Sequence, residues 1–165
     1  MPSGAHAVPG NGMIKAVFDA NVLVSAFLSR DNPGGVSGEL LRFVVVRAID
    51  LHLSIEIVDE AIRTLLSSMR AQRRYRYSRS DADEYRATLM MLATIIDDPL
   101  PMPGAVPRDP DDDKIVACAV AASAQHIVTR DDHLLSLGSY AGIAITTPEQ
   151  FIHLVRREFG RLPES

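Results

Sequence analysis

Two hydrophobic periods alternate along this chain: short β-branched runs, and longer stretches in which apolar residues recur every three or four positions. The short runs predict strands at residues 16–18, 51–54, 126–129 and 141–146. Helical spacing predicts helices over residues 21–28, 37–48, 55–68, 80–96, 110–122 and 148–158. Strands that alternate with helices in this way predict an α/β fold with a central, mostly parallel sheet covered by helices on both faces.

Turn-forming residues mark the connections between these elements. DNPGG at residues 31–35 and the proline-rich stretch at residues 97–110 predict loops, and Ser80 is the predicted N-cap of the helix over residues 80–96. A chain of 165 residues suits one domain, which we place at residues 13–158. Residues 1–12 are predicted to be a flexible extension, and residues 159–165 a C-terminal tail.

Composition narrows the class of protein. The net charge of −4 argues weakly against a general nucleic-acid coat protein, although it leaves room for a local basic patch. The single cysteine, Cys118, rules out a disulfide within the chain and suits a reducing compartment, and its apolar surroundings predict a core position. No apolar run approaches the roughly 20 residues of a membrane span, and the first residues do not resemble a signal peptide. We therefore expect a cytoplasmic protein without a membrane partner.

Four carboxylates crowd into five residues of the segment RDPDDDKIVACAVAA, directly before an apolar helix. Asp109 followed by Pro110 is a good N-cap and first-turn pair, and Asp112 could close a capping box. Each such contact at a helix start contributes only about 0.3–1 kcal/mol, and adding like charges gives part of this back. Capping thus explains Asp109 but not Asp111, Asp112 and Asp113 together.

Two further acids follow predicted strands. Asp19 comes directly after residues 16–18, and Asp131 comes shortly after residues 126–129. Either could simply cap the helix that follows it. However, parallel strands end at one edge of the sheet, where ligands bind in open α/β folds, and carboxylates that meet there raise one another's pKa. A divalent cation relieves this repulsion, and oxygen ligands suit Mg²⁺ or Mn²⁺.

Three segments resemble the motifs of the PIN-domain family: FDANVLVSAF, SIEIVDEAIRTL and DPDDDKIVACAVAASAQHIVTRDDHLL. The resemblance covers residues 14–154 and is greatest to VapC-like PIN proteins, the toxins of toxin–antitoxin pairs. It implies a PIN-like three-layer α/β/α sandwich and an endoribonuclease in which Mg²⁺ or Mn²⁺ activates a water molecule. It also implies a cognate antitoxin and a homodimer. The catalytic and metal-binding acids fall on Asp19, Glu60, Asp112 and Asp131.

Helical spacing alone does not select Glu60, because Glu56 also lies off the apolar stripe of its helix; the family register favours Glu60. Ala20 stands where a small hydroxyl residue is usual, and His133 stands where another acid is common. These departures support an alternative, a catalytically inactive module that binds RNA or protein. Supporting positions around the ligands are Asn21, Asp109, Asp113, Thr129 and His133, with Asp113 the replacement for Asp112 if the register is shifted by one.

One tract is strongly basic, with arginines interleaved with Tyr75 and Tyr77. Arginine binds phosphate in a bidentate manner and tyrosine stacks on unpaired bases, so the tract is a candidate RNA-binding surface. A solvated loop, or a contact surface for an acidic antitoxin segment, explains it equally well. The candidate RNA-binding residues are Arg70, Arg73, Arg74, Arg76 and Arg79. No phosphate-binding loop, dinucleotide fingerprint or nucleophile elbow is present.

Overall fold

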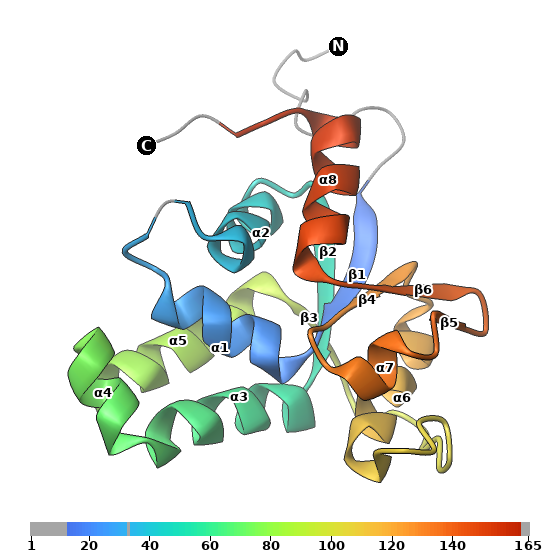
Figure 1. The fold of residues 1–165 in the computed structure, drawn as a ribbon, viewed down its shortest axis with the longest axis horizontal. Coiled ribbons are helices and arrows are strands. Elements are labelled where there is room, and N and C mark those ends of the chain that lie inside the picture. Colours follow the sequence, from blue (N-terminus) through green and yellow to red (C-terminus); the bar gives the residue numbers. More distant parts are fainter. Residues whose placement is uncertain (1–12, 33, 163–165) are drawn as a thin grey trace.

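The computed structural model describes residues 13–32 and 34–162 as an α/β fold, as the sequence predicts (Figure 1). Its strands are β1 (Ile14–Phe18), β2 (Ile49–Ser54), β3 (Thr94–Ile96), β4 (His126–Val128), β5 (Ser139–Tyr140) and β6 (Ile143–Thr146). They form one sheet in the order β3-β2-β1-β4-β6-β5, in which every neighbouring pair is parallel except β5 with β6.

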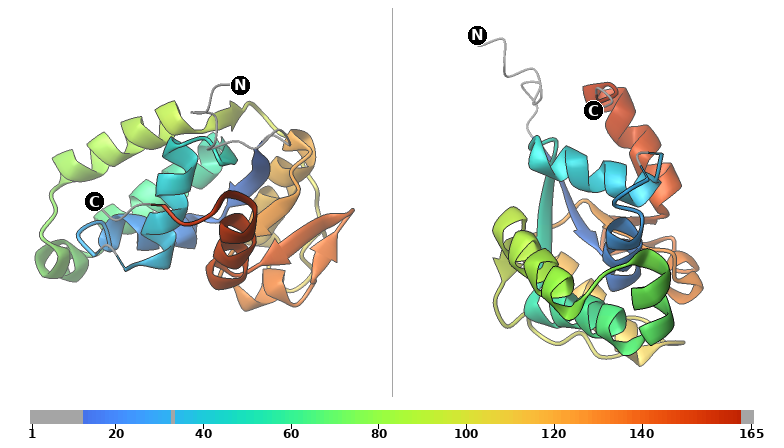
Figure 2. Two further views of the ribbon diagram at one scale, coloured as in Figure 1. Left: turned by 90° about the horizontal axis from the view of Figure 1, so that it is seen from above. Right: turned by 90° about the vertical axis from the view of Figure 1, so that its left-hand side faces the viewer.

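Helices surround this sheet in the expected layers. They are α1 (Ala20–Leu28), α2 (Val36–Val45), α3 (Ile55–Ser67), α4 (Met69–Tyr75), α5 (Arg79–Leu92), α6 (Asp113–Ala122), α7 (Asp132–Leu135) and α8 (Pro148–Phe159), with a 3₁₀ turn, η2 (Pro110–Asp112), before α6. Helix α6 packs on β1, β2, β3 and β4, while α2 and α8 cover the other face (Figure 2). None of the described helices is long and apolar enough to cross a membrane.

The core follows from the apolar runs of the sequence. Ala16, Val17 and Phe18 of β1 are fully buried, because β1 lies between β2 and β4 and is covered on both faces. Cys118 of α6 is also fully buried, which confirms the prediction that it belongs to the core. Helix α6 is rich in alanine and packs against the central strands β1, β2 and β4.

The segment predicted as one helix over residues 80–96 differs from the structure at both ends. Helix α5 begins earlier, because Ser78 and not Ser80 is its N-cap: Ser78 and Asp81 form a reciprocal capping box. The helix ends at Leu92, and residues 94–96 pair with β2 as the edge strand β3. A pattern of apolar residues does not distinguish a last helical turn from a short strand that a neighbouring strand supports.

The strand predicted over residues 141–146 begins at Ile143, because Ala141 and Gly142 form a hairpin turn. Both residues have positive φ, 50° and 83°, as a two-residue hairpin of this kind requires. The turn joins β6 to β5, a strand that the sequence pattern did not predict. The basic tract at residues 70–79, whose solvated alternative was a loop, instead contains α4 and the start of α5. The predicted extension at residues 1–12 lies outside the described residues, as do residues 163–165 of the predicted tail.

Candidate active site

Asp19 lies at the carboxyl end of β1, where the chain turns into α1. Its side chain is only 4% exposed, and three donors hold it. Oδ1 accepts from the backbone N–H of Ala20 at 2.7 Å. Oδ2 accepts from Thr129 Oγ1 at 2.7 Å and from Asn21 Nδ2 at 3.2 Å. A carboxylate offers about four lone-pair positions, so Asp19 is fixed in orientation and still keeps capacity for one further ligand.

Thr129 joins the ends of β1 and β4. It is fully buried; its hydroxyl donates to Asp19 and accepts from the backbone N–H of Asp131 at 2.9 Å. Asn21 adds a second link, since its side-chain oxygen accepts from the backbone N–H of Arg130 at 3.4 Å. The structure therefore brings the predicted residues Asp19, Asn21, Thr129 and Asp131 together. At position 20, where a hydroxyl residue is usual, only the backbone N–H of Ala20 donates to Asp19.

Asp112 is the last residue of η2, directly before α6, and its carboxylate lies near those of Asp19 and Asp131. Its side chain caps no helix, so the alternative reading as a capping residue fails here. Its Oδ2 atom is buried and has no hydrogen-bond partner among the described residues. Burial raises the pKa of Asp112 to about 8, together with contact with the Asp131 carboxylate and the negative charges of Asp19, Asp131 and Asp109.

Asp19 experiences the same environment. Burial raises its pKa, its hydrogen bonds to Thr129 and Ala20 oppose that rise, and the charges of Glu60 and Asp131 add to it. Several carboxylates thus share a partly buried space in which their own repulsion favours protonation. Oxygen donors with an unpartnered buried atom fit a hard divalent cation such as Mg²⁺ or Mn²⁺, which would replace the proton.

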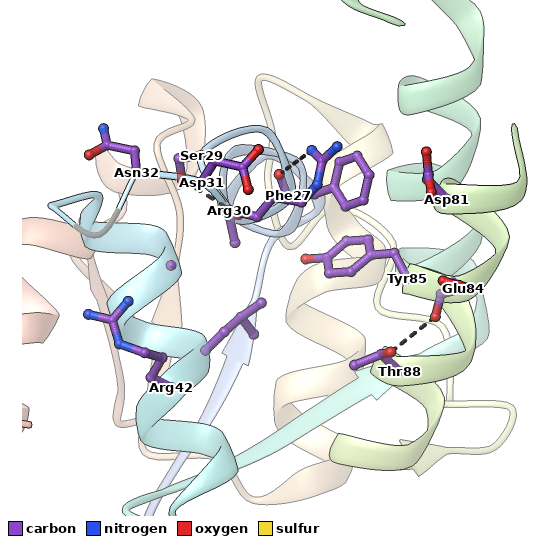
Figure 3. Close-up of a pocket in the computed structure, with 13 residues that line it drawn as sticks. Phe27, Ser29, Arg30, Asp31, Asn32, Arg42, Asp81, Glu84, Tyr85 and Thr88 are labelled. Carbon is purple, nitrogen blue, oxygen red and sulfur yellow. Dashed lines mark hydrogen bonds between the residues drawn. The ribbon is translucent and has the colours of Figure 1, made fainter. Parts of the chain in front are cut away.

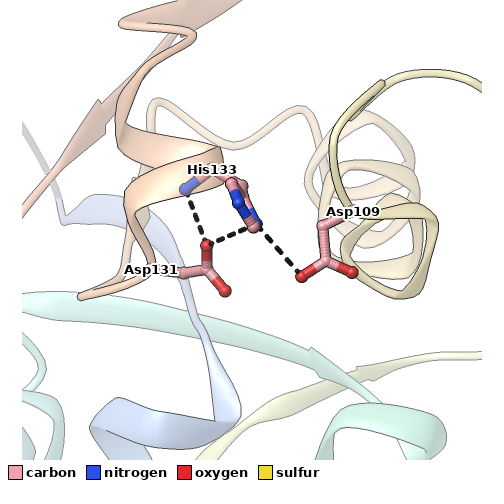
Figure 4. A group of neighbouring side chains, drawn as sticks. All are labelled: Asp109, Asp131 and His133. Carbon is pink, nitrogen blue, oxygen red and sulfur yellow. Dashed lines mark hydrogen bonds and ion pairs between the residues drawn. The ribbon is translucent and has the colours of Figure 1, made fainter.

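Asp109, Asp131 and His133 form a tighter group beside this space (Figure 4). One ligand atom from each lies within 4.8 Å of the others. His133 Nδ1 is 3.5 Å from Asp109 Oδ2 and 3.7 Å from Asp131 Oδ1. Asp131 also caps α7 by accepting from the backbone N–H of His133, and Asp109 caps η2 as the sequence predicts. His133, predicted as a supporting residue, is thereby placed where it could itself hold a metal ion.

Glu60 reaches the site from α3 and forms an ion pair with Lys114 of α6. Lys114 is a site residue that no sequence motif indicated. Burial lowers the pKa of this lysine, but its hydrogen bond to Glu60 and the charges of Glu60, Asp111 and Glu56 outweigh that effect and raise it overall. The only sequence signal was its position, directly after the run of acids. The negative charge of Glu60 acts on Asp19, so the two carboxylates are near each other, but that of Glu60 already has a cation.

Asp113 has a different task from the one predicted. Its two oxygens accept from the backbone N–H groups of Gly104 and Val106 at 3.0 and 2.7 Å. These bonds attach the proline-rich loop to the start of α6. This contact accounts for Asp113 without a ligand, and it leaves Asp112 as the acid of the run that faces Asp19 and Asp131.

The arginines of the basic tract are exposed, and none of them forms an ion pair with another described residue. Tyr75 is exposed, with the guanidinium carbon of Arg74 5.5 Å from its ring centre. Tyr77 is buried instead: its hydroxyl donates to the carbonyl of Leu65, and its ring packs edge-on against Phe27. The interpretation of Tyr77 as a base-stacking residue is therefore wrong.

A groove of about 550 Å³ is lined by Glu60 and by Tyr75 of this tract. It runs between α1 and α3, with Asn21 and Glu60 at one end and Tyr75 at the other, and apolar side chains such as Val24 and Leu28 line it. A second pocket, of about 600 Å³, lies between α1, α2 and α5 and contains none of the predicted site residues (Figure 3). In it Arg30 is held by the carbonyl of Phe27 and stacks on that ring.

Comparisons with known proteins identify the class of protein to which this fold and this acidic site belong. The family model described as PIN domain matches residues 15–133, so this chain belongs to the PIN-domain family. Among solved structures it resembles the crystal structure of PAE2754 from Pyrobaculum aerophilum, with a TM-score of 0.53, 16% identity and 94% coverage of both chains. At this identity the likeness concerns the fold. No curated protein matches the sequence. PIN domains are in general nucleases that use divalent metals.

The raised pKa of Asp112 predicts how the metal-free protein responds to pH. The pKa rises from 3.8 to about 8, so between these values the folded state binds a proton that the unfolded state lacks. The free energy of unfolding then falls as pH rises through this window. Asp112→Asn mimics the protonated carboxyl and removes this contribution. We expect the melting temperature of the variant to exceed that of the wild type by an increasing margin from pH 5 to pH 8.

Thermal melts in the presence of EDTA measure this margin, and Asp132→Asn, which changes an exposed neighbouring acid, is the matched control. Adding Mn²⁺ at pH 8 should stabilise the wild type and leave Asp112→Asn unchanged. A margin independent of pH would contradict the proton assigned to Asp112.

Proposed function

We propose that this protein is a Mg²⁺- or Mn²⁺-dependent endoribonuclease. One observation carries the proposal: Asp112 holds a buried, unpartnered oxygen toward Asp19 and Asp131, and its pKa is raised to about 8. A carboxyl in such surroundings costs stability when it ionises, and this is typical of functional sites rather than of structural ones. Membership of the PIN-domain family supports the same reading.

Asp19, Asp112 and Asp131 are the proposed ligands, with Asp109 and His133 beside Asp131, and Glu60 the fourth acid that the family resemblance implies. When bound, a divalent ion would supply a more acidic, more nucleophilic water and would neutralise charge on the phosphodiester.

The protein itself holds the proposed ligands in position. Thr129 and Asn21 orient Asp19, and the burial of Thr129 keeps that orientation rigid.

Removal of one ligand tests this proposal directly. Purified wild type incubated with total RNA should cleave it with Mg²⁺ or Mn²⁺ and not with EDTA. Products should carry 5′-phosphate and 3′-hydroxyl ends, as in the family it resembles. Asp19→Asn and Asp112→Asn should each lower the rate more than about 100-fold, because even residues that only support metal ligands are worth 10–100-fold.

Asp132→Asn is the control for charge, since this exposed acid adjoins Asp131 without facing Asp19 or Asp112. Its rate should equal that of the wild type. Undiminished cleavage by folded Asp112→Asn, in preparations free of other nucleases, would overturn the assignment.

The groove between α1 and α3 is the proposed path of single-stranded RNA. Its acidic end lies at Asn21 and Glu60, and its other end lies at the exposed ring of Tyr75, on which an unpaired base could stack. Arg74 lies beside that ring, with its guanidinium carbon 5.5 Å from the ring centre. Arg73 belongs to the same helix, α4, and Arg70 and Arg76 lie close by in the chain. Arg79 instead lines a separate hollow with Asp59, so it is the weakest member of the predicted set.

This path predicts a salt-dependent loss of binding. The double variant Arg73→Gln/Arg74→Gln should weaken binding of a fluorescent single-stranded RNA in EDTA, measured by anisotropy. Two lost phosphate contacts should lower the slope of log affinity against log salt by about 1.4, at about 0.7 for each contact. The pair Arg47→Gln/Arg157→Gln, also exposed but away from the groove, should change neither value. Equal losses in both pairs would show a general charge effect instead.

A role as the toxin of a toxin–antitoxin pair, acting in the cytoplasm as a homodimer under the control of a cognate antitoxin, extends this proposal. Its support is the resemblance to VapC-like proteins. Induced expression of the wild type should arrest growth of a host culture, whereas Asp112→Asn should not. Growth unaffected by an active nuclease would contradict the toxin role alone. Light scattering should give twice the chain mass of 18.0 kDa, and a short upstream gene that restores growth would identify the antitoxin.

A further inference from the structure

Lys114 places a positive charge on one side of the acidic site. It belongs to the first turn of α6, two residues after Asp112, and its ammonium contacts Oε1 of Glu60 on α3. Both side chains are largely shielded: that of Lys114 is 24% exposed and that of Glu60 is 34% exposed. The pair is therefore partly shielded from solvent, unlike ion pairs on the open surface, which are weak. Glu60 adjoins the acidic site, because its negative charge acts on Asp19.

The site thus has two unequal halves. On the Glu60 half, Lys114 meets Glu60 directly and also experiences the charges of Asp111 and Glu56. On the other half lie Asp19, Asp112 and Asp131, and no lysine or arginine pairs with any of them among the described residues. An ammonium compensates the negative charge on the first half. On the second half Asp131 has His133 beside it, and this imidazole carries a charge only when it is protonated.

We propose that the ammonium of Lys114 takes the place of a second divalent ion at Glu60, so that the site holds one ion, at Asp19, Asp112 and Asp131. This inference rests on the proposed metal-dependent function. In two-ion phosphodiesterase centres the ions lie about 3.5–4 Å apart. A second ion at Glu60 would have to displace Lys114 from its carboxylate, and the displaced ammonium would remain tethered beside it by α6.

The choice of lysine fits this role. The chain contains fifteen arginines but only two lysines, Lys15 and Lys114. The ammonium group is a compact point charge on a flexible stem, whereas the guanidinium group is a broad, planar fork. A compact, strongly hydrated charge is the closer substitute for a small metal ion between carboxylates.

Calorimetric titration of the full chain with MnCl₂ tests the inference by stoichiometry, without reference to activity. Wild type should bind one ion. Lys114→Met, which removes the charge and keeps an unbranched chain of similar length, should bind two, the second more weakly. Adding Glu60→Gln to Lys114→Met should return the stoichiometry to one, because the second site needs that carboxylate. Lys114→Arg should keep it at one.

Lys15→Met is the matched control, because Lys15 lies near the start of β1, about 13 Å of strand away from Asp19. It should bind one ion. If Lys114→Met does not fold by circular dichroism, Lys114→Gln replaces it. Two ions in the wild type, or one ion in folded Lys114→Met, would overturn the role of Lys114 and leave the metal site standing. No ion in any variant, the wild type included, would overturn the proposed function itself.

Discussion

Repulsion between partly buried carboxylates is the interaction on which this site depends. Asp19, Asp112 and Asp131 come from three separate segments and share one partly enclosed space at the carboxyl edge of the sheet. Burial deprives them of water, and each raises the cost of ionising the others. The surrounding structure must therefore hold them in place against this force. Thr129 does so from beneath, through one hydroxyl that serves both the side chain of Asp19 and the backbone of Asp131.

The crowded acids of the segment at residues 109–113 divide their tasks. Asp109 begins η2 and faces His133, Asp112 faces Asp19, and Asp113 holds the proline-rich loop through two backbone N–H groups. Asp111 remains exposed and contributes to the field around Lys114. A single 3₁₀ turn makes this possible, because its tighter winding changes the direction of successive side chains just before α6 begins. Four like charges within five residues thus end in four different environments.

The sequence predicted those parts of the structure that depend on local pattern. Buried β-branched runs marked β1 and β4, and the rule that parallel strands share an edge placed Asp19 near Asp131. Asp109 was predicted as a cap because Pro110 follows it. The strands β3 and β5 were not predicted. They have only three and two residues, and pairing with β2 and β6, rather than their own sequence, makes them strands. Long-range packing also decides the burial of Tyr77.

Partnerships between distant side chains were the hardest to foresee. The spacing of residues in α3 does not indicate that Glu60 pairs with Lys114, because α3 and α6 become neighbours only in the folded protein. The spacing does not indicate the short distance between His133 and Asp109 either. Asp109 precedes η2 and His133 belongs to α7, and only the fold brings these two elements together. Residue type and charge predict that acidic side chains form ion pairs with cations, but the fold determines which cation pairs with each acid.

The hydrogen bond between Asp19 and Thr129 spans 110 positions of the chain. During translation the amino-terminal strand emerges from the ribosome long before β4, which must insert beside it. Contacts of such sequence separation form late, after the intervening loop has closed. In a nascent chain the acidic centre therefore assembles only when nearly the whole domain has been synthesised. Any chemistry that the centre performs begins only after that point of synthesis.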